Sequence, residues 1–178
     1  MLLSKEMVEI LEAVADGAPT LESVVFTSGE PLMLGEELVT VVRAAAEKRL
    51  GTRIVTNGFW ARTPRHAESW VARLYDAGFR ELNLSTGDDH PEWVPFESDA
   101  NGALAAASAR IFTAVNVEEH DGARFRAADV LREPSIRFFL GHHPNQHLLI
   151  VTGGLWLSLR NAREFAYSPN EACPDLFW

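Results

Sequence analysis

Four clusters of polar residues stand out because each directly follows a short apolar run typical of a β-strand. The clusters occupy residues 27–31 (TSGEP), 56–58 (TNG), 85–90 (STGDDH) and 116–120 (NVEEH). Their hydroxyl, amide and carboxylate groups are the groups that bind small polar molecules, and three of the four contain glycine. A polar turn with a capping residue is a sufficient explanation for any one cluster. Four clusters at equivalent strand ends instead predict a shared ligand site.

The elements that must position these clusters alternate between helices and strands. Apolar residues recur at helical spacing in four segments, which are 4–17, 35–50, 64–78 and 101–110. Short apolar runs between them predict strands at 24–26, 53–56, 81–85 and 111–117. This alternation is typical of right-handed crossovers and a mainly parallel sheet, in which all carboxyl ends of the strands lie at one edge. The sequence therefore predicts an α/β fold.

Beyond Asp121 the pattern is looser. A helix interrupted at Pro134 and one further strand centred on residues 148–152 are expected there, and the last twenty residues have no clear period. We therefore expect residues 1–125 to form a βα core and residues 126–178 to continue the same domain with one more strand.

Composition excludes several classes of partner. The chain has 178 residues, 47% of them apolar, and a formal net charge of -9, which disfavours nucleic acids and anionic membranes. It has no apolar run near the roughly eighteen residues of a membrane span, and because MLLSKEMVEI lacks a basic stretch followed by a long hydrophobic one, we expect no secretory leader. The single cysteine, Cys173, cannot form an internal disulfide, which fits a reducing compartment. We expect a cytoplasmic protein with no nucleic-acid or membrane partner.

Three segments together resemble a known family. TSGEPLM, residues 27–33, is similar to the GGEP motif after the second strand of radical S-adenosylmethionine (radical SAM) enzymes, with Thr27 and Ser28 in place of a small residue and the first glycine. IVTNG resembles the third-strand TNG of many members, and LSTGDDHPEWVP resembles the fourth-strand segment of a subset. Each motif alone is short, but the three occur in the family's order between about residues 3 and 121.

The resemblance implies a partial (β/α)6, TIM-like barrel that lacks its first strand and binds S-adenosylmethionine. The residues that match cofactor-binding positions are Ser28, Gly29, Glu30, Pro31, Thr56, Asn57, Ser85 and Asn116. Strand-end carbonyls and the Glu30 carboxylate would accept hydrogen bonds from the methionine ammonium, and Gly29 would permit close approach. Ser85 matches the position that contacts the ribose, and Asn116 would face the same ligand.

The chain departs from the family at its defining feature, the CxxxCxxC loop that carries the cluster. In the family that loop precedes the helix that is expected here from about Ser4, and the three residues from Met1 to Leu3 are too few to contain it. A 4Fe-4S cluster needs several thiolates, so none is expected from this chain alone, and the chain is not competent as a radical SAM enzyme without an added CxxxCxxC segment.

Three explanations of this departure stay open. The chain could be a degenerate paralogue that keeps the scaffold for binding, as an accessory component of a modification or biosynthetic system. It could be a truncated or split enzyme whose cluster loop lies on another segment or chain. The likeness could also be only to a generic α/β fold. Because a missing first strand would leave a sheet edge uncovered, we expect a partner chain, a homodimer or the C-terminal third of this chain to cover it. A structural role in a hetero-complex is a further alternative.

The third cluster offers a possible acid–base group, because Asp88 or Asp89 could orient the imidazole of His90. The alternative is a capped turn before Pro91. His142, His143 and His147 form another candidate cluster, but Pro144 disfavours a helix there, and no metal site is expected.

Tryptophans complete the candidates for binding. Trp60 and Trp93 follow strand-end loops, where they could wall a pocket for a small molecule or contact a peptide, whereas Trp70 falls on the apolar stripe of its helix and is expected in the core. GxxxxGK[ST], GxGxxG and GxSxG are absent from the sequence, so triphosphate hydrolysis, Rossmann dehydrogenase chemistry and serine hydrolysis have no support.

Overall fold

The computed structural model describes residues 4–27, 29–88, 90, 93–120 and 122–154. The helices are α1 (Ser4–Gly17), α2 (Glu36–Glu47), α3 (Pro64–Asp76), α4 (Phe96–Ser108), α5 (Ala127–Arg132) and α6 (Pro134–His142), with short 3-10 turns η1 (Pro31–Leu34) and η2 (Gln146–Leu148). The strands are β1 (Ser23–Phe26), β2 (Gly51–Thr56), β3 (Glu81–Thr86), β4 (Phe112–Glu118) and β5 (Leu149–Gly154). In these ranges no helix is long and apolar enough to cross a membrane.

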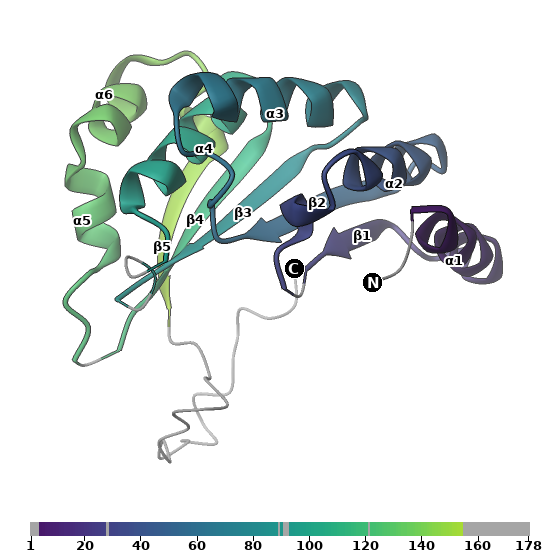
Figure 1. Cartoon of the computed structure of the whole chain (residues 1–178). Coiled ribbons are helices and arrows are strands. Elements are labelled where there is room, and N and C mark those ends of the chain that lie inside the picture. Colours follow the sequence, from purple (N-terminus) through teal and green to yellow (C-terminus); the bar gives the residue numbers. More distant parts are fainter. Residues whose placement is uncertain (1–3, 28, 89, 91–92, 121, 155–178) are drawn as a thin grey trace.

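The five strands form one parallel sheet in the order β1-β2-β3-β4-β5. Each strand pairs with the next one along the chain, so right-handed crossovers put successive helices on the same face of the sheet. Figure 1 shows this layer of helices above the strands. The predicted α/β fold with a parallel sheet and alternating helices is confirmed, and β5 adds the predicted further strand to that sheet.

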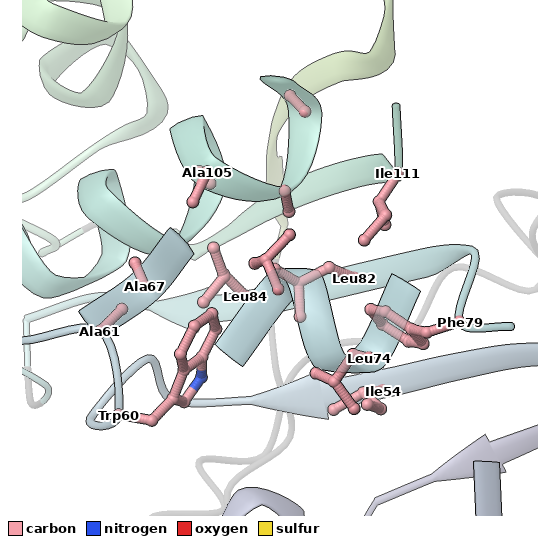
Figure 2. Close-up of a cluster of buried hydrophobic side chains, with 14 of the residues drawn as sticks. Ile54, Trp60, Ala61, Ala67, Leu74, Phe79, Leu82, Leu84, Ala105 and Ile111 are labelled. Atoms are coloured by element: carbon pink, nitrogen blue, oxygen red, sulfur yellow. The ribbon is translucent and has the colours of Figure 1, made fainter. Parts of the chain in front are cut away.

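The core lies between the sheet and this helical layer. Ile54, Leu82 and Leu84 project from β2 and β3 and are at most 1% exposed, and Leu74 of α3 meets them from the helical side (Figure 2). Burial of each such side chain contributes about 1.5–3 kcal/mol. The strands therefore carry apolar residues at alternate positions because only one of their faces meets the helices.

Local signals in the sequence explain most element boundaries. Thr63 caps α3 by accepting a hydrogen bond from the His66 amide at 3.3 Å, and Pro64 supplies a fixed φ in the first turn. The predicted break at Pro134 is confirmed: Glu133 separates α5 from α6, and its carboxylate accepts from the Ile136 amide at 2.8 Å.

The start of α4 was predicted wrongly at residue 101. The helix begins at Phe96, directly after Pro95 as N-cap, and Glu97 and Asp99 lie in its first turn. Acidic side chains are favourable at this end because the unpaired amides of the first turn carry a partial positive charge. The sequence had indicated a loop for the segment TGDDHPEWVPFESD, whose last residues instead form the first turns of α4.

Candidate functional site

The face of the sheet that is turned away from the helices carries a cavity of about 490 Å3. Its lining residues come from all five strands and are Val25, Arg53, Val55, Asn83, Ser85, Asn116, Thr152 and Gly154. They occupy the strand positions that alternate with the buried core residues, which follows from the period of two in a strand. We call this surface the open face.

A row of hydrogen-bonding side chains crosses the open face toward the carboxyl ends of the strands. Ser85 of β3 is in register with Asn116 of β4, which is in register with Thr152 of β5. The Thr152 hydroxyl donates to Asn116 Oδ1 at 2.9 Å. This bond directs the oxygen of the Asn116 amide toward β5 and leaves its nitrogen to donate to a ligand.

A charged pair lies on the same face nearer the amino ends of the strands. Arg53 is in register with Glu81, and Arg53 Nε lies 2.7 Å from Glu81 Oε1. The same oxygen accepts from Asn83 Nδ2 at 3.2 Å. The open face therefore combines one ion pair, Arg53 with Glu81, with several uncharged polar groups.

Glu30 joins two of the strand-end clusters. Its Oε1 accepts from Thr56 Oγ1 at 2.7 Å and from the Leu32 amide at 3.1 Å, and its Oε2 accepts from the Asn57 amide at 2.9 Å. The Thr56 hydroxyl in turn accepts from Trp60 Nε1 and from the Gly58 amide, both at 3.2 Å. The carboxylate thus fixes the loop after β1 against the end of β2.

The predicted cofactor-binding residues consequently separate into two groups. Ser85 and Asn116 line the cavity of the open face. Glu30, Thr56 and Asn57 form the network between loops, and the Thr56 side chain faces the helices and is 3% exposed. Near them, Gly29 has a positive φ of 59° and Pro31 begins η1, while Ser28 lies outside the described residues.

The possible acid–base loop has a structural role at its first residue. Asp88 accepts from the Arg124 amide at 2.9 Å and the Phe125 amide at 2.7 Å, and these bonds hold the pKa of the carboxyl below its usual value. The backbone of His90 closes a turn by bonding to Gly87 and Trp93. Asp89 lies outside the described residues. Asp88 therefore anchors the segment after β4 and is not among the residues that line the cavity.

The remaining candidates are engaged in local packing. His142 stacks on Phe138, and His143 stacks on Phe139 and accepts from the Asn145 amide. Within the described residues there is no group of three or more His, Cys, Asp or Glu residues that could hold a metal ion.

Two of the tryptophans turn out to differ sharply in exposure. Trp60 is 3% exposed and packs in the core, so it does not wall the cavity, whereas Trp93 is 80% exposed. Trp70 is only partly buried, and the Arg73 guanidinium lies 3.8 Å from its ring centroid.

Several residues of the open face were not found from the sequence. Arg53, Asn83 and Thr152 lie inside segments that were read as apolar strands. The signal that would have found Asn83 is the alternation in ELNLS, where every second residue is polar; TRIVT has no such alternation, so Arg53 had no comparable signal.

A buried acid, Asp99, was also missed. It lies on α4, is 0% exposed, and burial raises its pKa to about 8 against the opposing effect of the Thr86 hydroxyl. An ideal Cβ built on Gly58 would be only 2.2 Å from Asp99 Oδ1, which places this acid directly behind the loop that Glu30 holds.

Comparison with known proteins adds no family to this description. None of the known protein-family models matches the chain. No curated protein matches its sequence at a significant level.

Proposed function

We propose that the chain binds a small polar ligand on the open face, as a binding or accessory component, and that S-adenosylmethionine is the first candidate for this ligand. The observation that carries the proposal is the cavity of about 490 Å3 bordered by the row of Ser85, Asn116 and Thr152. Ligand sites commonly have volumes of about 300–1,000 Å3 and a few convergent polar groups.

The sheet order supports reading the open face as the inner surface of a partial barrel. Five parallel strands in sequential order with helices on one face are what a segment of a (β/α) barrel contains, whereas a doubly wound sheet reverses its order and has helices on both faces. In barrels the ligand lies at the carboxyl ends of the strands. The row of polar side chains is at this end of the open face.

The donor set fits a nucleoside better than it fits an iron-sulfur cluster. A hydroxyl and an amide on adjacent strands, Ser85 and Asn116, can bond to ribose hydroxyls. The chain contains one cysteine, Cys173, whereas a 4Fe-4S cluster requires several thiolates. We therefore assign these residues to binding and orienting the ligand and derive no reductive cleavage from them.

A second candidate is a role as one part of a larger barrel. In the described ranges β1 bonds to β2 alone, so its other edge presents backbone donors and acceptors that a strand from another chain could pair. That partner could also carry the cluster loop of a split radical SAM enzyme. A stable hetero-complex isolated with the native partner, and lost when Val25 is replaced by proline, would favour this role.

Isothermal titration of the purified protein with S-adenosylmethionine tests the main proposal. Replacing Asn116 or Ser85 with alanine should each weaken binding by about tenfold, which corresponds to one hydrogen bond of about 1.4 kcal/mol. Asn145→Ala is the matched control, because its amide donates to the Ser108 carbonyl at 3.0 Å in the turn before β5. Absence of binding by the wild-type protein, or equal weakening by all three changes, would contradict the proposal.

A further inference from the structure

We infer that Arg53 forms a subsite for an oxyanion at the amino-end side of the open face, so that the ligand class includes an organic carboxylate or phosphate. This inference rests on the proposed function, because it takes the open face as a ligand site, and it adds the chemistry of one end of the bound molecule. The two chemistries share a pair of oxygens that a guanidinium can bind in a bidentate manner.

The Arg53 guanidinium is held in one orientation by its neighbours. Its Nε lies 2.7 Å from Glu81 Oε1 in an ion pair, and Asn83 Nδ2 donates to the same oxygen at 3.2 Å. The strand register places Arg53 beside Glu81, and Asn83 follows two residues later on the same face of β3. A guanidinium whose position is fixed in advance loses less side-chain entropy when it binds an anion.

The outer edge of this guanidinium is available for a ligand. An arginine has five N–H donors, and within the described residues the ion pair of Arg53 is with Glu81 through Nε, on one side of the guanidinium. The side chain is 46% exposed and lines the cavity. A half-exposed ion pair contributes only about 0–1 kcal/mol to stability. The pair with Glu81 therefore serves mainly to aim the guanidinium.

The surroundings favour an organic anion over a bare inorganic ion. Val25, the register neighbour of Arg53 on β1, and Val55, two residues further along β2, line the same cavity. Their methyl groups can contact an apolar portion next to the charged group. Among the described residues that line the cavity, Arg53 is the one basic residue, so it marks the position of the oxyanion.

The spacing along the strands gives the size of the ligand. Glu81, level with Arg53, lies four residues before Ser85 on β3, and at about 3.3 Å per residue the two levels are about 13 Å apart. A single molecule that reaches both levels would be elongated, with an anionic end on Arg53 and hydrogen-bonding groups on Ser85 and Asn116.

The test follows the Nε–H signal of Arg53 by nuclear magnetic resonance in the uniformly 15N-labelled full chain, assigned by its loss in Arg53→Gln. Succinate and inorganic phosphate are the probes, and sodium chloride keeps the ionic strength constant. We expect saturable shifts of this signal in the wild type and tighter binding of succinate than of phosphate. In the Arg53 variants, where this signal is absent, the side-chain amide signal of Asn83 in the same cavity reports the affinity, which should be weaker by about tenfold or more in Arg53→Gln. Arg53→Lys keeps the charge without the planar fork and should bind less tightly than wild type.

Arg73→Gln is the matched control. Arg73 also pairs with a glutamate, Glu36, and its side chain is 40% exposed, but it lies on α3 in the helical layer. Its signal should not saturate, and its replacement should leave the response of Arg53 unchanged. Equal responses of Arg53 and Arg73, or a response of Arg53 that does not saturate with either probe, would overturn the inference. Tighter binding of phosphate than of succinate would overturn the preference for an organic anion.

Failure of this inference is distinguishable from failure of the proposed function. If S-adenosylmethionine does not bind while the probes saturate Arg53, the oxyanion subsite stands and the nominated ligand is wrong. If S-adenosylmethionine binds with the same affinity in Arg53→Gln and neither probe saturates the signal, the ligand site stands and the subsite is refuted.

Discussion

Replacing Asp99 with asparagine should stabilise the protein at neutral pH. The carboxyl is 0% exposed, lies between α4 and the loop at Gly58, and has a pKa raised by burial to about 8 from an ordinary value of 3.8. The Thr86 hydroxyl is close enough to favour the ionised form slightly, but neither carboxylate oxygen has a hydrogen bond of normal geometry. Folding therefore requires this group to keep its proton.

The size and sign of the effect follow from proton linkage. Between pH 3.8 and about 8 the unfolded chain has lost this proton and the folded chain keeps it, so the free energy of unfolding falls as pH rises through this window. Each pH unit above 3.8 lowers the free energy of unfolding by about 1.4 kcal/mol. About three units separate 3.8 from neutral pH, so the free energy of unfolding is lower by about 4 kcal/mol at pH 7. Asparagine resembles the protonated acid in shape and removes this cost.

Urea denaturation of both proteins from about pH 5 to about pH 8 measures the difference. The midpoints should lie close together at the acid end and separate progressively toward pH 8, with Asp99→Asn the more stable protein. Asp76→Asn, at the exposed end of α3, is the control and should show no such separation. Parallel pH profiles for wild type and Asp99→Asn would refute the account of a buried neutral acid.

Three further changes test the loops and packing that support the open face. Thr56→Val removes the hydrogen bonds to Glu30, Trp60 and Gly58 and should lower the free energy of unfolding, measured by urea denaturation, by about 2–3 kcal/mol. Thr40→Val on the exposed side of α2 is the control and should change it by less than about 0.5 kcal/mol. Gly78→Ala puts a Cβ at φ 100° and 2.4 Å from Ala46 Cβ, so the free energy of unfolding should fall by more than about 1 kcal/mol. Gly141→Ala in α6 is the control, because its Cβ would meet no atom within 4 Å, and it should raise the free energy of unfolding. A change of the same sign in both variants would contradict the packing at Gly78. Asp88→Asn should speed hydrogen exchange at the Arg124 and Phe125 amides, because both amides donate to the Asp88 carboxylate. In the wild type the protection of these amides should be lost as pH falls through the lowered pKa of Asp88. Exchange unchanged by the substitution would show that Asp88 does not hold this segment.

The order of helices and strands was predictable because each element has a local signal. The apolar run at Val24 and the helical stripe through Val71 and Leu74 need no tertiary information, and the break at Pro134 follows from the missing amide of proline. The start of α4 was missed because its first turn, with Glu97 and Asp99, is as polar as a loop. Only the packing against β3 shows that Asp99 is buried.

The candidate site was only partly predictable, because it depends on register between strands. Ser85 and Asn116 were identified from their places at strand ends, and the structure puts them side by side. The pairing of Arg53 with Glu81 joins residues 28 positions apart, and a shift of one residue in either strand would have placed them on opposite faces.

Glu30 illustrates a different limit of sequence reasoning. Its motif predicts a carboxylate directed at a ligand, which stays a prediction; in the structure the side chain accepts from the Leu32 amide, the Thr56 hydroxyl and the Asn57 amide. A glutamate beside a turn can serve either purpose, and only the positions of the neighbouring amides distinguish them.

The side-chain amide signals of asparagine, recorded during a titration with S-adenosylmethionine, test the central claim most directly. Asn83 and Asn116 line the open face, whereas Asn101 and Asn145 bond to backbone carbonyls of the helical side and its loops. A ligand site on the open face predicts saturable shifts of the Asn83 and Asn116 signals with those of Asn101 and Asn145 unchanged. No saturable shift, or shifts confined to Asn101 and Asn145, would contradict it.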